Sequence, residues 1–448
     1  MNAFRVLATI SLLLVGNTRL PAECPDGHTA QPNRHTERSD GHAAQPNRYS
    51  VRQLGSAWTA IDPHGQPVFL VGINHLRDTV PQNVDRETFY RSALTKVRSW
   101  GINHLGYGTP KELHDDMPFM QEQIYTYGSQ FRTRDRFEYV DVFDPEFQRK
   151  TREKVRVVCE SVKDHPNLIG HYWTDTTRWN IDVARRLRGK DWVSSIRQLP
   201  ADAPGKRRYA DFLRHRYHND VAAYTKAYGH LIADFDDIRV FDFREFDRDN
   251  AAGRADDESF LGVIANELYG VIGRAYRDFA PGVLQFGPRF KLHDHPDVVL
   301  AAVAPWVDVI SIQPGPEVGP RPGPGRDERI FDGEAFDRIH DLTGKPILIC
   351  DHRVSFRTAE APVTLWHQFA TQGEAACAAT KFMLAAARKP YLIGYSHCQY
   401  IDKRSPERGN MVKPGFLRDD GTPYRVYVDE IMEATKKMKQ LHATKLER

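Results

Sequence analysis

Two aspartates are the last residues of apolar runs, a position from which a carboxyl group can take part in catalysis. Asp175 ends the run LIGHYWTD, and Asp351 ends ILICD. Cleavage of a glycosidic bond needs two carboxyl groups, one to protonate the leaving oxygen and one to act as nucleophile or to activate water. Carboxyl groups suit this task because burial and mutual repulsion can keep one protonated and the other ionised. The alternative is a structural role, as a helix N-cap or as the partner of Arg178 or Arg353.

Other apolar runs also end in polar or aromatic residues, so a larger site is expected around the two aspartates. The expected site residues at these ends are Asn74, His75, His104, Tyr107, His171, Trp173, Arg289, Gln313, His352, His397 and Gln399. Tyr400 closes the last run. The bodies of the runs stay apolar, which indicates that one end of each run carries the function.

The elements that must position these residues alternate along the chain. Apolar strands are predicted near 67–74, 101–107, 117–121, 167–173, 283–287, 306–313, 345–351 and 391–400. Helices are predicted near 85–99, 144–162 and 258–279, with a long helical, charged insertion near 176–255. The strands are continuous apolar runs, as expected when helices cover both faces of a parallel sheet.

This order predicts an α/β fold, a (β/α)8 TIM barrel with a long helical insertion after strand 4. A doubly wound sheet is the main competitor, but the expected glycine-rich phosphate loop is missing after the first strand, where the sequence reads GINHLRD. In such a barrel the functional residues gather where the carboxyl ends of the strands meet.

Other reaction classes have weaker support. The sequence contains no GxSxG motif, and Cys350 is expected to point away from the barrel mouth if Asp351 points into it. A metal-dependent barrel hydrolase often takes an HxH pair from strand 1, where this chain has only His75; HDH at 293–295 lies past strand 5. We therefore expect no cofactor and no catalytic metal, with a metal-dependent hydrolase kept as an alternative.

Composition fits a soluble globular protein, with 40% hydrophobic and 27% charged residues over 448 positions. The net charge of +3 and the scattered Lys and Arg give no basic stripe, so no nucleic-acid partner is expected. The five cysteines form no CxxC pair, and the sequence does not show whether two of them form a disulfide.

The N-terminus predicts export. One basic residue precedes the apolar run VLATISLLLVG, and Ala22 offers a cleavage point. We expect a signal peptide at 1–22, a flexible linker at 23–48 with the duplication DGHTAQPNR and DGHAAQPNR, and one catalytic domain at 49–448. The mature protein would then be secreted or periplasmic and have no membrane contact. Oligomeric state cannot be read from the sequence.

From about Pro67 to Tyr427 the order of motifs resembles the β-agarases of glycoside hydrolase family 50 and their retaining (β/α)8 relatives. The matching stretches are HPNLIGHYWTDTTRW, VLQFGPRF, WVDVISIQ, LTGKPILICDHRVSF and the region of YLIGYSHCQYIDKR. This resemblance implies a (β/α)8 glycosidase acting on a polysaccharide or oligosaccharide through two glutamates, a nucleophile after strand 7 and an acid/base after strand 4.

The sequence departs from that family at both catalytic positions. Asp351 stands at the nucleophile position, and aligning the strand-4 motif places Thr176 at the acid/base position with Asp175 before it. Three interpretations remain: Asp175 takes over the acid role, the shorter side chains favour inversion, or hydrolysis is lost and sugar binding is kept. The N-terminal β-sandwich of such agarases is missing, so Trp179 and Trp192 of the insertion are candidates for stacking on sugars.

Overall fold

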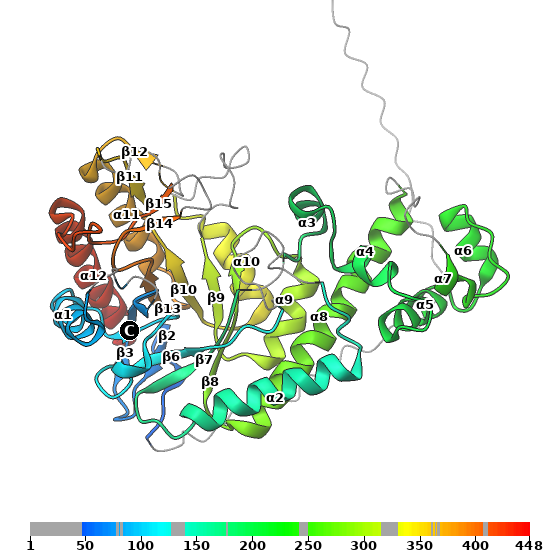
Figure 1. Ribbon diagram of the computed structural model, residues 1–448, viewed down its shortest axis with the longest axis horizontal. Coiled ribbons are helices and arrows are strands. Elements are labelled where there is room, and N and C mark those ends of the chain that lie inside the picture. The colour runs from blue at the N-terminus through cyan, green and yellow to red at the C-terminus, as the bar shows by residue number, and fades with distance from the viewer. Residues whose placement is uncertain are drawn as a thin grey trace, which may run out of the picture. The chain divides into compact units, whose positions relative to one another are not determined.

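Eight parallel strands close into a barrel, as the sequence predicts (Figure 1). The computed structural model describes residues 47–448 except 78–79, 81–83, 127–138, 176–177, 242–249, 315–329, 360–361, 363, 365–367 and 406–410. The expected signal peptide and nearly all of the expected linker lie outside the described residues. The barrel strands, in chain order, are β4 (Leu70–Ile73), β5 (His104–Leu105), β6 (Phe119–Glu122), β7 (Leu168–Asp175), β8 (Leu284–Lys291), β9 (Ile310–Gln313), β10 (Ile347–His352) and β13 (Leu392–His397).

Helices alternate with these strands and surround them (Figure 1). The helices that follow or precede barrel strands are α1 (Arg86–Ser99), α2 (Pro145–Val162), α8 (Ala251–Phe279), α9 (Asp297–Val303), α10 (Gly333–Thr343), α11 (Gln372–Ala387) and α12 (Arg425–Leu446). Two short 3-10 helices span Lys111–Leu113 and Ala304–Trp306. Among the helices of the described residues, none combines the length and the apolar composition needed to cross a membrane.

Local sequence explains where several helices begin. Asp85 caps α1 by accepting from the backbone N–H of Thr88 at 2.8 Å, and Asp144 caps α2, which has Pro145 in its first turn. Thr371 and Glu374 form a reciprocal capping box at the start of α11. Glu374 therefore has a structural role at a helix end.

The insertion after strand 4 is helical, as predicted. Its helices are α3 (Ile181–Arg188), α4 (Trp192–Arg197), α5 (Pro204–Arg216), α6 (Val221–Tyr228) and α7 (Asp237–Val240). Arg197 of α4 forms a buried ion pair with Asp257 of α8, and its Nε donates to the Tyr209 hydroxyl of α5 at 2.8 Å. The long helix α8 then returns the chain to the barrel at β8 (Figure 1).

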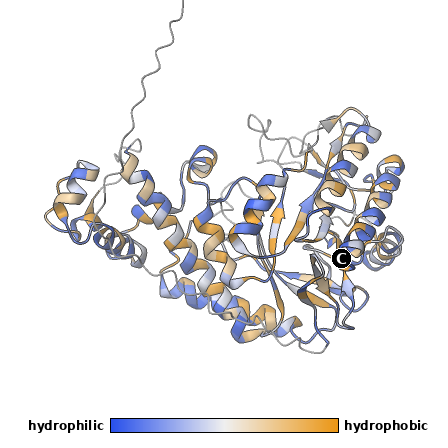
Figure 2. Cartoon of the chain, turned by 180° about the vertical axis from the view of Figure 1, so that it is seen from behind, coloured by the Kyte–Doolittle hydropathy of each residue, from blue (hydrophilic) through white to orange (hydrophobic). Residues whose placement is uncertain are grey.

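A short antiparallel sheet covers the amino-terminal end of the barrel. It consists of β1 (Ser50–Leu54), β2 (Ala57–Ile61) and β3 (Pro67–Val68). Tyr49 and Ala60 join the apolar cluster inside the barrel, which includes Leu70, Ile169 and Leu284. Apolar residues dominate the barrel strands (Figure 2). The barrel is therefore a packed core, and an active site is expected at the carboxyl ends of its strands.

Short strands beyond the barrel extend its carboxyl end. β11 (Ser355–Phe356) pairs with β12 (Gln368–Phe369) after strand 7, and β14 (Lys403–Ser405) pairs with β15 (Met411–Lys413) after strand 8. The four described cysteines, Cys159, Cys350, Cys377 and Cys398, are free thiols.

Candidate active site

The Asp351 carboxylate lies at the carboxyl end of β10, where side chains from three other strands reach it. Its Oδ2 accepts from Arg289 Nη1 at 2.7 Å and from Gln313 Nε2 at 3.1 Å. Its Oδ1 accepts a longer contact of 3.4 Å from Asn74 Nδ2, which also donates to the Cys350 carbonyl at 2.7 Å. A Cβ on Gly106 would lie 1.9 Å from Asn74 Oδ1, so glycine is needed there for Asn74 to keep this position.

Arg289 connects this carboxylate to Tyr107. The same Nη1 donates to the Tyr107 hydroxyl at 2.6 Å, and the guanidinium carbon lies 5.0 Å from the centre of the Tyr107 ring. Tyr107 in turn stacks on Tyr172 of β7, with ring centres 5.7 Å apart. Burial works to lower the pKa of Arg289, but Tyr107 and Asp351 outweigh it and hold that pKa well above its ordinary value. Arg289 is therefore a permanent cation beside Asp351.

Burial raises the pKa of the Tyr107 phenol well above its ordinary value. The phenol is therefore neutral, and because its oxygen accepts from Arg289 it keeps a proton to donate. Asp351 is 3% exposed, and Arg289 is similarly enclosed. The arrangement can hold a carboxylate ionised in a site of low water content and present it beside a neutral hydroxyl donor.

Irregular strand pairing explains how Asp351 comes to face this cluster. Between Ile349 and His352, β10 contains one more residue than β13 across the same span. Such a bulge redirects side chains, and bulges are common next to active sites. Cys350 consequently lies in the cluster inside the barrel while Asp351 faces the mouth. Cys350 and Asp351 therefore do not share a position at the mouth, although both lie on the inner side of the barrel.

A second carboxylate cannot be assigned from side-chain geometry. The backbone of Asp175 lies in register with Arg289, after a second irregularity between Tyr172 and Asp175. The Asp175 side chain and Thr176 lie outside the described residues, so the separation of the two aspartate carboxyl groups stays open.

Glu122 was not anticipated from the sequence. It ends β6 in register with Tyr172 and accepts from Arg77 Nη2 at 2.7 Å. The sequence signal was present, since Glu122 is the first acid after the apolar MPFM run.

His75 lies beside the cluster and carries an unusual backbone conformation. Its φ is +60°, in the left-handed region, and its N–H donates to the Tyr107 carbonyl at 2.8 Å. Its ring meets the Tyr107 ring edge-on at 4.5 Å. His75, Asp351 and Cys398 each have one potential metal-ligand atom, and these three atoms all lie within 4.8 Å of one another. Cys398 was not among the predicted site residues, although it directly follows strand 8.

Two predicted site residues of strand 4 face the helices. A register shift near the start of β7 turns His171 and Trp173 outward. Trp173 stacks on Tyr276 of α8 at 5.7 Å, and its Nε1 donates to Gln285 at 3.0 Å. His171 packs on the same Tyr276 ring at 4.7 Å. The structure therefore does not bring either residue to the mouth.

Three predicted residues of strands 7 and 8 are likewise buried elsewhere. His352 stacks on Phe382 of α11 at 4.1 Å and is hydrogen-bonded to the Tyr395 hydroxyl. His397 lies 5.2 Å from the Phe416 ring. Gln399 is 1% exposed, and its Nε2 donates to the Ile401 carbonyl at 2.9 Å.

His104 lies inside the barrel below the mouth. It is fully buried, and its Nε2 lies 3.4 Å from Ser396 Oγ. Burial lowers the pKa of His104, His171 and His397 to about 3. These histidines are therefore neutral, and their contacts lie within the packed scaffold.

The two tryptophans of the insertion pack on each other. Trp179 and Trp192 stack at 4.9 Å, and Trp179 also meets Tyr269 of α8 at 5.6 Å. Both are essentially fully buried. The expectation that they stack on sugars is therefore corrected, because their faces are already covered by aromatic neighbours.

The three residues of the HDH stretch at 293–295 do not form one cluster, because each has different surroundings. His293 approaches Asp332 at 3.4 Å, and Asp294 pairs with Arg178, which was expected as a partner of Asp175. His295 is buried, and burial lowers its pKa to about 3. Arg353, the other expected partner, donates to the Gly415 carbonyl and lies over the Tyr427 ring at 4.2 Å. Asp351 therefore forms its ion pair with Arg289 instead of the expected Arg353.

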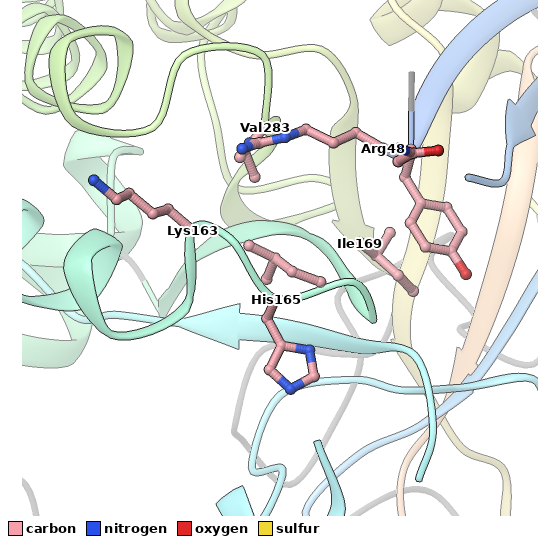
Figure 3. A pocket seen from close by; sticks show the side chains of 8 residues that line it. Arg48, Lys163, His165, Ile169 and Val283 are labelled. Carbon is pink, nitrogen blue, oxygen red and sulfur yellow. The ribbon is translucent and has the colours of Figure 1, made fainter. Parts of the chain in front are cut away.

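A small pocket lies at the opposite end of the barrel (Figure 3). It is lined by Asn47, Arg48, Tyr49, Lys163, His165, Leu168, Ile169 and Val283. Lys163 points away from the other labelled side chains (Figure 3). The lining residues precede β1, β7 or β8 or lie at the start of β7, so the pocket is separate from the Asp351 cluster at the carboxyl end of the barrel.

Solved structures share this fold. The chain matches an exo-beta-agarase with a TM-score of 0.71 and 19% identity, over 89% of this chain and 66% of that one. It matches the agarase AgWH50C with a TM-score of 0.71 and 19% identity, over 88% and 65%. A beta-galactosidase from the psychrophilic Marinomonas ef1 matches with a TM-score of 0.58 and 14% identity, over 84% and 60%.

These likenesses confirm the expected fold resemblance to the family 50 agarases. At such identities they show a shared barrel, and the chain spans about two thirds of the length of the agarases that it matches. No protein-family model and no curated protein matches the sequence.

Proposed function

We propose that this protein is an exported glycoside hydrolase that cleaves a galactan-like polysaccharide or oligosaccharide. The observation that carries the proposal is the buried Asp351 carboxylate, held by Arg289 and Gln313 at the carboxyl end of barrel strand 7. The resemblance seen in the sequence implies a nucleophile at this strand end, and the chain shares its barrel fold with solved agarase structures. The sequence supports export through its N-terminal apolar run.

In this mechanism Asp351 is the nucleophile or the base, and Asp175 is the acid/base or the residue that orients it. Arg289 keeps Asp351 ionised, so that the carboxylate can attack the anomeric carbon or take a proton from water. Tyr107 is neutral and can donate to a sugar hydroxyl or to the carboxylate. His75, Asn74 and Gln313 complete the side of the site that meets the sugar.

The test is hydrolysis of agarose, agaro-oligosaccharides and an activated aryl β-galactoside by the full chain and its variants. Asp351→Asn should lower kcat by roughly 10²- to 10⁴-fold, as expected for the loss of an acid–base or nucleophilic group. If Asp351 is the nucleophile, Asp351→Ala with added azide should release the glycosyl azide from the aryl substrate. Proton NMR of the first-formed anomer distinguishes retention from inversion. Full activity in Asp351→Asn would contradict the assignment.

A second candidate is a carbohydrate-binding barrel without turnover. Thr176 favours it, because this residue stands where the resembling family carries its acid/base. A binding protein would retain oligosaccharides in affinity electrophoresis, release no reducing ends, and respond to Asp351→Asn only through affinity. A hydrolase would show reducing ends that disappear in the same variant.

A further inference from the structure

Three different metal-binding side chains meet at the barrel mouth. We propose that His75, Asp351 and Cys398 bind a thiophilic divalent cation of the zinc class. One ligand atom from each residue lies within 4.8 Å of the other two. Imidazole nitrogen, carboxylate oxygen and thiolate sulfur are the three donor types from which protein zinc sites are built. Among the residues that the structure describes, this is the one cluster of its kind.

The spacing is close to that of a bound ion. With zinc bonds of about 2.0–2.3 Å, ligand atoms in a tetrahedral site lie about 3.3–3.8 Å apart. The observed limit of 4.8 Å exceeds this by about an ångström, which small rotations about the side-chain bonds of the three residues can close. Three protein ligands leave the fourth position open to water or to another ligand.

Neighbouring barrel strands hold the three residues in place. β4, β13 and β10 lie side by side in the barrel, and His75, Cys398 and Asp351 stand at their carboxyl ends. The Cys398 N–H donates to the His352 carbonyl at 3.1 Å, and the Asn74 N–H donates to the His397 carbonyl at 3.0 Å. The cluster therefore rests on a hydrogen-bonded backbone, as a preorganised metal site requires.

The bonds of Asp351 are compatible with an ion. Arg289 and Gln313 both donate to Oδ2, at 2.7 and 3.1 Å, and Asn74 Nδ2 lies 3.4 Å from Oδ1. A carboxylate oxygen has two lone pairs, so Oδ1 can bind a metal while Oδ2 keeps Arg289. The thiolate of Cys398 selects zinc, cobalt or copper over magnesium and calcium, which prefer oxygen ligands.

The consequence for catalysis rests on the proposed function. An ion on Oδ1 occupies the carboxylate that hydrolysis requires, so zinc should inhibit the enzyme and a chelator should leave or raise its activity. Loss of hydrolysis on chelation would instead make the ion catalytic and overturn this step. The binding step is tested without any turnover, so failure of the proposed function and failure of the metal site are distinguishable.

The experiment is titration of the metal-free, reduced full chain with Co²⁺, followed by displacement with Zn²⁺. We expect a thiolate-to-cobalt charge-transfer band in the near ultraviolet that saturates at one equivalent and disappears on zinc addition. Cys398→Ser should abolish the band. His75→Asn, in which asparagine tolerates the positive φ, should weaken cobalt binding at least roughly tenfold, since even indirect support for a ligand has an effect of that size.

Matched controls separate this site from other thiols and imidazoles. Cys377→Ser removes the exposed thiol on α11, and Cys24→Ser removes the thiol near the histidine-containing duplication; both should keep the band. Circular dichroism checks that each variant is folded. A band that survives Cys398→Ser, an unchanged affinity in His75→Asn, or a wild-type chain that shows no band would overturn the proposal.

Discussion

At the residue scale, the central feature is a carboxylate enclosed together with its counter-ion. Asp351 and Arg289 have side chains that are 3% and 13% exposed, and their charged atoms lie 2.7 Å apart. A buried pair contributes little beyond an apolar replacement, but a single buried charge left behind is strongly unfavourable. Such a pair indicates a purpose other than stability, and an ionised carboxylate at a barrel mouth supplies one.

This pairing predicts the behaviour of Arg289 variants. Arg289→Gln leaves the Asp351 charge buried without its cation, so we expect the free energy of unfolding to fall by about 3–5 kcal/mol. The double variant Asp351→Asn/Arg289→Gln removes both charges and should recover most of that loss. Urea unfolding of the three proteins measures this. A double variant no more stable than Arg289→Gln would show that the charge pair is not the cause.

Arg289→Gln also bears on the pH dependence of hydrolysis. Without the nearby cation the carboxylate ionises less readily, so the acid limb of the pH–rate profile should move to higher pH. Arg289→Lys keeps the charge but loses the guanidinium geometry and should leave that limb nearly in place while kcat falls. A limb that moves equally in both variants would contradict an electrostatic role.

At the element scale, the sequence predicted the strands and helices better than the directions of their side chains. Apolar runs and the Asp144-Pro145 start located β7, β10 and α2 closely, because their patterns are local. The predicted side-chain direction is wrong where a strand contains one more residue than the strand paired with it. The outward direction of Trp173 follows from such a shift in β7, and a register shift leaves no mark in a single sequence.

The pairing of Arg289 with Asp351 could not be predicted either. Both residues were recognised as strand ends, but they are 62 positions apart in the sequence and meet only through closure of the barrel. Sequence reasoning therefore named both residues as strand ends, and barrel closure determined that their side chains touch.

The outward position of Trp173 predicts a purely structural role. Its ring stacks on Tyr276 and its Nε1 bonds Gln285, so Trp173→Ala should reduce the free energy of unfolding by about 3–5 kcal/mol. Trp173→Phe keeps most of the stacking and should be less destabilising. KM should be unchanged in Trp173→Phe, because the ring faces α8. A raised KM at unchanged stability would show instead that the ring reaches the substrate.

At the scale of the whole molecule, burial of neutral imidazoles links folding to pH. Burial lowers the pKa of His104, His171, His295 and His397 to about 3, from an ordinary value of 6.5. The unfolded chain therefore binds more protons than the folded chain between these values. Stability from these groups is fully present above pH 6.5 and is lost as the pH falls from 6.5 towards 3.

We accordingly expect the free energy of unfolding to decline below pH 6.5, with each such histidine adding about 1.4 kcal/mol per pH unit to the slope. His171→Phe keeps an aromatic ring against Tyr276 but cannot take up a proton, so its slope should be smaller by that amount. The exposed His64 offers the control, and the slope of His64→Gln is measured for comparison. Urea unfolding at pH values between 7.5 and 4.5 gives all three slopes. A slope identical in wild type and His171→Phe would place the acid sensitivity in other groups. A reduced slope would show that the neutral His171 imidazole, packed against Tyr276 behind the barrel strands, contributes to the acid sensitivity.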